Sequence, residues 1–159
     1  MLFRSPGLEM FLPTPLYAVT QFGRWDEVLA EPMPAPDFPF HQAMWHYARG
    51  MALAAKGNRK EAAEEFARLQ QLSSNEKIRA LDTEALAFPA TRLVQIAEHT
   101  LAGELARQDG KYGEAVRHFQ MGVDIQDDLP YMEPPYWYVP LRMLLGDALL
   151  GAEIGRAHV

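Results

Sequence analysis

The pattern of apolar and polar positions along the chain predicts amphipathic helices, most clearly from Leu93 onward. Apolar residues recur there at steps of three and four, which is the period of a helix with one buried face. They are Leu93, Ile96, Ala97, Leu101, Leu105 and Ala106. Gly110 ends this helix, because glycine adopts the left-handed conformation of a C-terminal cap without steric cost. A second helix follows after a short connection, so we expect two antiparallel neighbours. Its inner side carries Ala115, Val116, Phe119 and Val123.

The same spacing of small and aromatic residues occurs elsewhere in the chain. The residues at equal relative offsets are Gly50, Gly57, Ala62 and Phe66 in one place and Gly103, Gly110, Ala115 and Phe119 in the other. Gly23 starts a third match (GRWDEV against GKYGEA), and Gly146 lies in a fourth, LLGDALL. A glycine inside a helix costs about 1 kcal/mol relative to alanine, so we expect Gly50 and Gly103 to permit close approach of a partner helix. Four matches indicate a helical array.

These motifs resemble those of the tetratricopeptide repeat (TPR) family. The resemblance implies an all-α fold in which antiparallel helix pairs stack as a TPR-like α-solenoid, with residues 6–152 as a single array. The positions Gly23 and Gly57 are 34 residues apart, whereas Gly57 and Gly110 are 53 apart, so we expect long connectors. Structural roles in the repeat are implied for Gly50, Gly57, Ala62, Phe66, Gly103, Gly110, Ala115, Phe119 and Gly146.

The segments between these matches predict short helices and proline-rich connectors. Residues 12–31 predict two short helices around a turn at Gly23, with Thr14 as the N-cap of the first. Prolines interrupt residues 32–39, and residues 74–91 form a long connector with one or two helical turns. Residues 129–140 must be extended, because a residue before proline is pushed away from helix. This segment resembles a YxEPPxWxxPxR pattern that introduces a repeat in some bacterial TPR proteins.

The two ends of the chain resemble translated sequencing adapters, MLFRS at residues 1–5 and EIGRAHV at residues 153–159. We therefore expect these ends to be non-native and the chain to be a fragment of a longer bacterial repeat protein. The compartment stays open, with the cytoplasm favoured.

Composition excludes several classes of function. The net charge is −6 and no basic stripe offsets it, which argues against nucleic acid as a partner. The chain contains no cysteine, so disulfides and thiolate metal sites are excluded. No apolar run reaches the length of a membrane span.

Titratable residues do not form a recognisable catalytic or metal-binding pattern. His41 and His46 are five apart, which is not the spacing of two metal ligands on one helix face. His46 and His99 occupy equivalent repeat positions, so we expect packing roles for both. Glu61 and Glu65 predict a solvated helix face. We expect no catalytic residue, no metal and no cofactor, and do not expect an enzyme.

The first helices of TPR pairs line a concave groove, and this gives candidate binding residues. They are Met44, Tyr47, Met51 and Ala54, then Thr100, Glu104 and Arg107, then Met143, Asp147 and Leu150. Met51, Glu104 and Asp147 stand where chaperone-binding TPR domains carry clamp asparagines, and the two acidic groups would repel a carboxylate. A groove with methionines suits an apolar or basic peptide. The alternative is that the methionines and Tyr47 pack against neighbouring connectors.

Two functions fit this sequence. The first is an interaction scaffold that binds a protein or peptide through its concave face. The alternative is an accessory repeat segment of a larger enzyme, for example an oxidoreductase, whose catalytic part lies outside this sequence. Residues 138–151 predict a helix whose leucines exceed what the preceding repeat can bury, so self-association through this helix is expected.

Overall fold

Helices account for all the regular secondary structure in the described part of this computed structural model, residues 6–83 and 87–157. Within these residues there are a short 3-10 helix, eight α-helices and no strand, which confirms the all-α class. The elements are η1 (Pro6–Phe11), α1 (Thr14–Gln21), α2 (Trp25–Ala30), α3 (Pro39–Ala55), α4 (Arg59–Ser73), α5 (Glu76–Leu81), α6 (Ala90–Gln108), α7 (Tyr112–Asp127) and α8 (Leu141–Ala157).

Three glycines end helices where the sequence predicts turns. Gly23, Gly57 and Gly110 follow α1, α3 and α6, with φ angles of +66°, +81° and +73°. A side chain at Gly57 or Gly110 would meet no other atom within 4 Å. The left-handed backbone, and not lack of space, is therefore the reason for glycine at these two turns.

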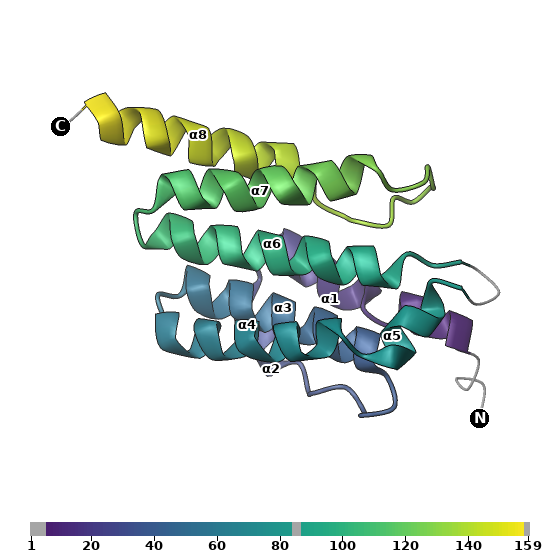
Figure 1. Cartoon of the computed structure of the whole chain (residues 1–159). Helices are drawn as coiled ribbons and strands as arrows, with labels where there is room; N and C mark the ends of the chain where they lie inside the picture. Colours follow the sequence, from purple (N-terminus) through teal and green to yellow (C-terminus); the bar gives the residue numbers. More distant parts are fainter. Residues whose placement is uncertain (1–5, 84–86, 158–159) are drawn as a thin grey trace.

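The long helices lie side by side (Figure 1). Helix α3 packs against α4 and α6, α6 packs against α7, and α7 packs against α8. The short helices α1 and α2 pack on α3, and α5 packs on α3 and α6. The core runs continuously from α1 to the start of α8, and Phe40, Met44, Leu93, Ile96 and Leu141 are among its fully buried side chains.

The glycines inside helices differ in what they face. A Cβ on Gly103 would lie 2.6 Å from Cε1 of Phe119, so α6 and α7 approach closely there. A Cβ on Gly50 would lie 2.5 Å from Cδ2 of Leu101, so Gly50 faces α6 and not α4. Gly146 has nothing within 4 Å. The expectation that Gly146 is equivalent to Gly103 is therefore not met in its packing.

The other positions assigned from the repeat pattern are mostly interior. Ala62, Ala115 and Phe119 are fully buried, whereas Phe66 is only partly buried at the edge of the core. Phe119 packs with Ala106, Ala115 and Ala148 in a separate small cluster between α6, α7 and α8.

Several sequence-based boundaries need correction or fall outside the described residues. Thr14 is not an N-cap, because Pro13 takes that position and no side chain caps the helix. Helix α8 runs on without a break through Glu153 to Ala157. The expectations for residues 1–5 and 158–159 concern parts of the chain outside the described residues. In the part that the structure describes, every helix is too short or too polar to cross a membrane.

Candidate functional site

The face expected to line a groove is divided into a buried part and an open part. The buried residues are Met44, Tyr47, Ala54, Thr100 and Glu104. Met51 is half-buried, and the exposed residues are Arg107, Met143, Asp147 and Leu150. Tyr47 packs against a neighbouring connector, as the alternative interpretation of the sequence predicts. The buried residues are not accessible to a partner.

Aromatic side chains from two distant segments cover Tyr47. One segment is α1, and the other joins α7 to α8 and is called here the aromatic connector (residues 129–140). The hydroxyl of Tyr138 donates a hydrogen bond to the hydroxyl of Tyr47 over 3.3 Å. The Trp137 ring lies 5.3 Å from that of Tyr47, between ring centroids. Tyr17 of α1 stacks on Tyr138 with centroids 4.6 Å apart and an interplanar angle of 17°.

The tyrosine hydroxyls of this cluster are held in the neutral form. Burial raises the pKa of Tyr47 to about 12. Burial also raises the pKa values of Tyr17 and Tyr138, and electrostatic interaction with Tyr47 adds to both shifts. In the described residues, the Tyr17 hydroxyl and the indole nitrogen of Trp137 are buried with no hydrogen-bond partner. Each such group costs about 1–3 kcal/mol, so ring packing must outweigh this cost.

Gln126 of α7 fixes the end of the aromatic connector. Its side-chain amide donates to the carbonyl oxygen of Val139 over 3.1 Å, and its side-chain oxygen accepts from the backbone N–H of Leu141 over 3.0 Å. Leu141 is fully buried, and a Cβ on Gly122 would lie 2.3 Å from its Cδ2. One glutamine thus sets the direction in which α8 leaves the connector.

The charges in and beside the open part differ from those expected. Arg107 donates two hydrogen bonds to the Glu104 carboxylate, over 2.8 and 2.7 Å, and Gln108 donates a third over 3.0 Å. The hydrogen bonds that Arg107 donates to Glu104 raise the pKa of Arg107, and the charge of Asp147 adds to this shift. Glu104 is therefore a buried carboxylate paired with Arg107, and not a free charge on the surface. The net charge of Glu104, Arg107 and Asp147 together is −1.

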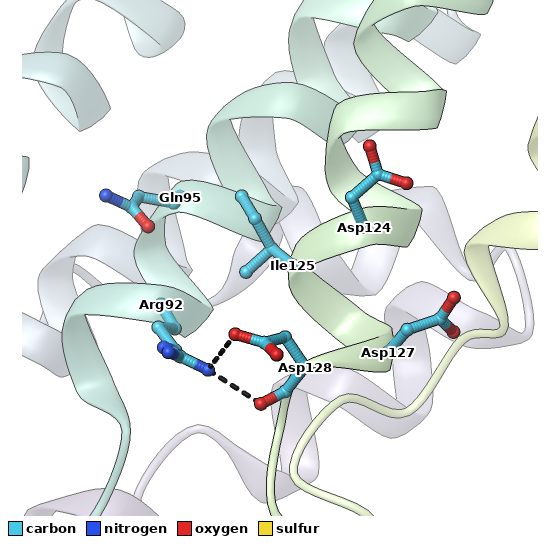
Figure 2. Close-up of a pocket in the computed structure, with 6 residues that line it drawn as sticks. All are labelled: Arg92, Gln95, Asp124, Ile125, Asp127 and Asp128. Carbon is cyan, nitrogen blue, oxygen red and sulfur yellow. Dashed lines mark hydrogen bonds and ion pairs between the residues drawn. The ribbon is translucent and has the colours of Figure 1, made fainter.

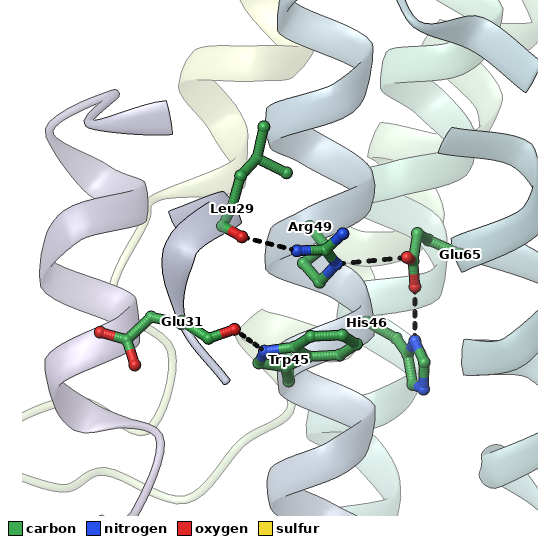
Figure 3. A network of polar contacts seen from close by, with 6 residues as sticks. All are labelled: Leu29, Glu31, Trp45, His46, Arg49 and Glu65. Carbon is green, nitrogen blue, oxygen red and sulfur yellow. Dashed lines mark hydrogen bonds and ion pairs between the residues drawn. The ribbon is translucent and has the colours of Figure 1, made fainter. Parts of the chain in front are cut away.

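A polar network ties α2 and α4 to α3 (Figure 3). The Glu65 carboxylate contacts Nδ1 of His46 over 2.5 Å and Nε of Arg49 over 3.3 Å. Arg49 also donates to the carbonyl oxygen of Leu29 over 2.9 Å and lies over the Trp45 ring. Burial acts to raise the pKa of Glu65, but the bonds from His46 and Arg49 outweigh it and lower the pKa overall. The spacing of Glu61 and Glu65 predicts a solvated helix face. This prediction is wrong for Glu65, which is drawn into the network with His46 and Arg49. His46 has the packing role expected of it.

Carboxylates gather around a surface hollow of about 440 Å³ between α6 and α7. Figure 2 shows Arg92 bound to Asp128, through the side chain over 3.0 Å and the backbone carbonyl over 2.7 Å. Asp127 pairs with Arg142, and Asp124 accepts from Gln120 over 2.8 Å. These partners leave the hollow without a free acid–base pair. Among the described residues, no group of three His, Asp or Glu side chains is placed to hold a metal ion.

Two histidines meet across α6 and α7. The Nδ1 atoms of His99 and His118 are 3.3 Å apart, and the ring centroids are 5.6 Å apart. Burial lowers the pKa of His99, and the nearby His118 lowers it further. This contact supports the predicted packing role of His99.

Comparison with protein-family models, with curated proteins and with solved structures finds no match to this chain.

Proposed function

We propose that this chain is a protein-interaction scaffold built of TPR-like repeats. In this proposal α3 with α4 and α6 with α7 are the antiparallel helix pairs of a short solenoid, and α8 is the first helix of the next pair. Support comes from the positive-φ glycines between the helices of each pair and from the packing of α6 on α3 and of α8 on α7. The role is binding, and the residues at the open part of the concave face carry it.

The observation that carries the proposal is the exposed apolar face of α8. Met143 and Leu150 are 66% and 59% exposed, and they stand two helical turns apart with Asp147 between them. Large apolar side chains at the i and i+7 positions of one helix form a surface that a partner can cover. The local net charge of −1 favours an apolar or basic peptide over an acidic one.

The buried part of the face restricts where a peptide binds. Tyr17, Trp137 and Tyr138 occupy the space over Tyr47, so a peptide is confined to the part beside Arg107 and α8. The interface is therefore short, and we expect weak, reversible binding of the kind found for small interfaces.

Peptide selection from a displayed random library tests the proposal. We expect apolar and basic sequences to be enriched, and their binding to be lost in Leu150→Asp. The matched control is Met121→Asp on α7, because Met121 is 50% exposed but lies on another helix. The proposal fails if acidic C-terminal peptides are enriched, or if the selected peptides bind Leu150→Asp as tightly as they bind the Met121→Asp control.

A further inference from the structure

A second, separate surface feature lies on the outer side of the aromatic cluster. It is a pocket of about 270 Å³ between the end of η1, α1, the loop before α6 and the aromatic connector. Its walls include Met10, Phe11, Tyr17, Phe88, Met132 and Tyr136. None of these residues belongs to the open part of the concave face, so the pocket is independent of the function proposed above.

The aromatic walls of this pocket are fixed by contacts with one another. Phe88 packs edge-on against Tyr136, with ring centroids 5.7 Å apart, and against the buried Phe40, with centroids 5.1 Å apart. Tyr17 is held by its stacking on Tyr138. Since these rings are already in place without a ligand, binding does not have to order them. Preformed, mostly apolar walls are typical of small-molecule sites.

The lining also defines the chemistry of the ligand. None of the residues that line the pocket is charged, and the exposed polar ones are Thr14 and Gln21 on α1. An ion placed there would lose water without gaining a counter-charge, which is unfavourable. Flat apolar rings, in contrast, gain from offset or edge-to-face packing against aromatic walls. The volume lies just below the range of about 300–1,000 Å³ for drug-sized ligands.

From these observations we infer that the pocket binds a small neutral aromatic molecule of one or two fused rings. The rings lie among Phe88, Tyr17 and Tyr136. Thr14 and Gln21 are available for a single polar substituent at the mouth of the pocket.

Titration of the full chain with indole, observed through ¹³C-labelled methionine methyl groups, tests this inference. Met10 and Met132 line the pocket, whereas Met33, Met121 and Met143 are exposed elsewhere. We expect saturable shifts with one Kd at the first two methyl groups and none at the other three. Indole-2-carboxylate, which adds a negative charge to the same rings, should bind at least about tenfold more weakly.

Pocket-filling variants provide the second readout. Ala18 lines the pocket and is exposed, so Ala18→Trp should fill it and weaken indole binding by at least about tenfold. Thr14 lines the pocket one turn before Ala18 on α1, so Thr14→Trp should also fill the pocket and weaken indole binding. The matched control is Ala67→Trp, on an exposed position of α4 away from the pocket. The inference is overturned if the methyl chemical shifts do not saturate, or if they change equally at all the methionines. It is also overturned if indole binds the folded Ala18→Trp and Thr14→Trp variants as tightly as it binds the unchanged chain.

Discussion

The hydroxyl groups of Tyr138 and Tyr47 are hydrogen-bonded over 3.3 Å, although 91 residues separate them in the sequence. This contact brings the aromatic connector onto α3. Trp137 and Tyr17 pack around it. The chain thus covers Tyr47 with its own segments and leaves the outer face of α8 accessible.

Removal of the central ring of this cluster should both destabilise the fold and expose Tyr47. Trp137 is 2% exposed, so Trp137→Ala should cost about 3–5 kcal/mol in the free energy of unfolding. In the fraction that remains folded, the pKa of Tyr47 should fall from about 12 toward its ordinary value, as seen by absorbance during alkaline titration.

Tyr131→Ala is the matched control for this variant. Tyr131 lies on the same connector but is 87% exposed, so its loss should change stability by less than about 0.5 kcal/mol. Equal effects of the two substitutions would show that the connector does not pack on α3.

Two helical glycines should respond to alanine with opposite signs. Gly103→Ala places a methyl group 2.6 Å from the Phe119 ring and should destabilise by about 1–3 kcal/mol. Gly146→Ala meets no atom within 4 Å and should stabilise by about 0.5–1 kcal/mol through helix propensity. Urea denaturation of both variants measures the difference. A stabilised Gly103→Ala would refute the close approach of α6 and α7.

The network around Glu65 should make stability depend on acid pH. The pKa of Glu65 is lowered in the folded chain, so the unfolded chain takes up a proton first as pH falls. Its contribution is therefore complete above the ordinary glutamate pKa, about 4.3, and is lost as pH falls through that value toward the lowered one. Glu65→Gln should cost about 1.5–3 kcal/mol at neutral pH and flatten the acid dependence.

Glu61 provides the comparison for this titration, because it is exposed on the same helix. Glu61→Gln should leave both the stability and its acid dependence nearly unchanged. Thermal denaturation between about pH 3 and pH 7 compares the variants, and an identical pH profile for the two would contradict the role given to Glu65.

The exposed face of α8 should also support self-association at high concentration. Met143, Leu150 and Ile154 are 66%, 59% and 60% exposed and lie on one face of the helix. Light scattering should show a mass that rises with protein concentration, and Ile154→Asp should reduce this rise. If the mass stays that of a single chain over the whole range, this part of the account is wrong.

The helices and their turns were predictable from the sequence. The packing of Tyr47 against a connector was one of two alternatives, but the sequence did not identify which segments cover it. The spacing of apolar residues and the glycines at positions 23, 57 and 110 depend on local geometry, which short sequence windows contain. The position of Trp137 over Tyr47 depends on how a connector far away in the sequence folds back onto α3. No local sequence pattern encodes this long-range contact. A usable signal was the density of aromatic residues between Tyr131 and Tyr138, which is high for a solvated connector.

The error at Glu65 has a similar origin. Glu61 and Glu65 are one turn apart on α4, and this spacing alone suggests a single solvated face. The partner that draws Glu65 inward is His46, which lies on α3 and is 19 residues away. To predict a side-chain pair between two helices, one must know how each helix is rotated about its axis. The repeat pattern does not specify this rotation to within one residue.

The central claim is that α1 and the aromatic connector cover Tyr47. Nuclear Overhauser contacts between the aromatic rings test this claim most directly. The ring centroids are 4.6 Å apart for Tyr17 and Tyr138 and 5.3 Å apart for Tyr47 and Trp137. We therefore predict strong ring-to-ring contacts within both pairs for the free chain in solution. A well-folded chain in which both pairs lack these contacts, with Tyr47 exposed to solvent, would contradict the claim.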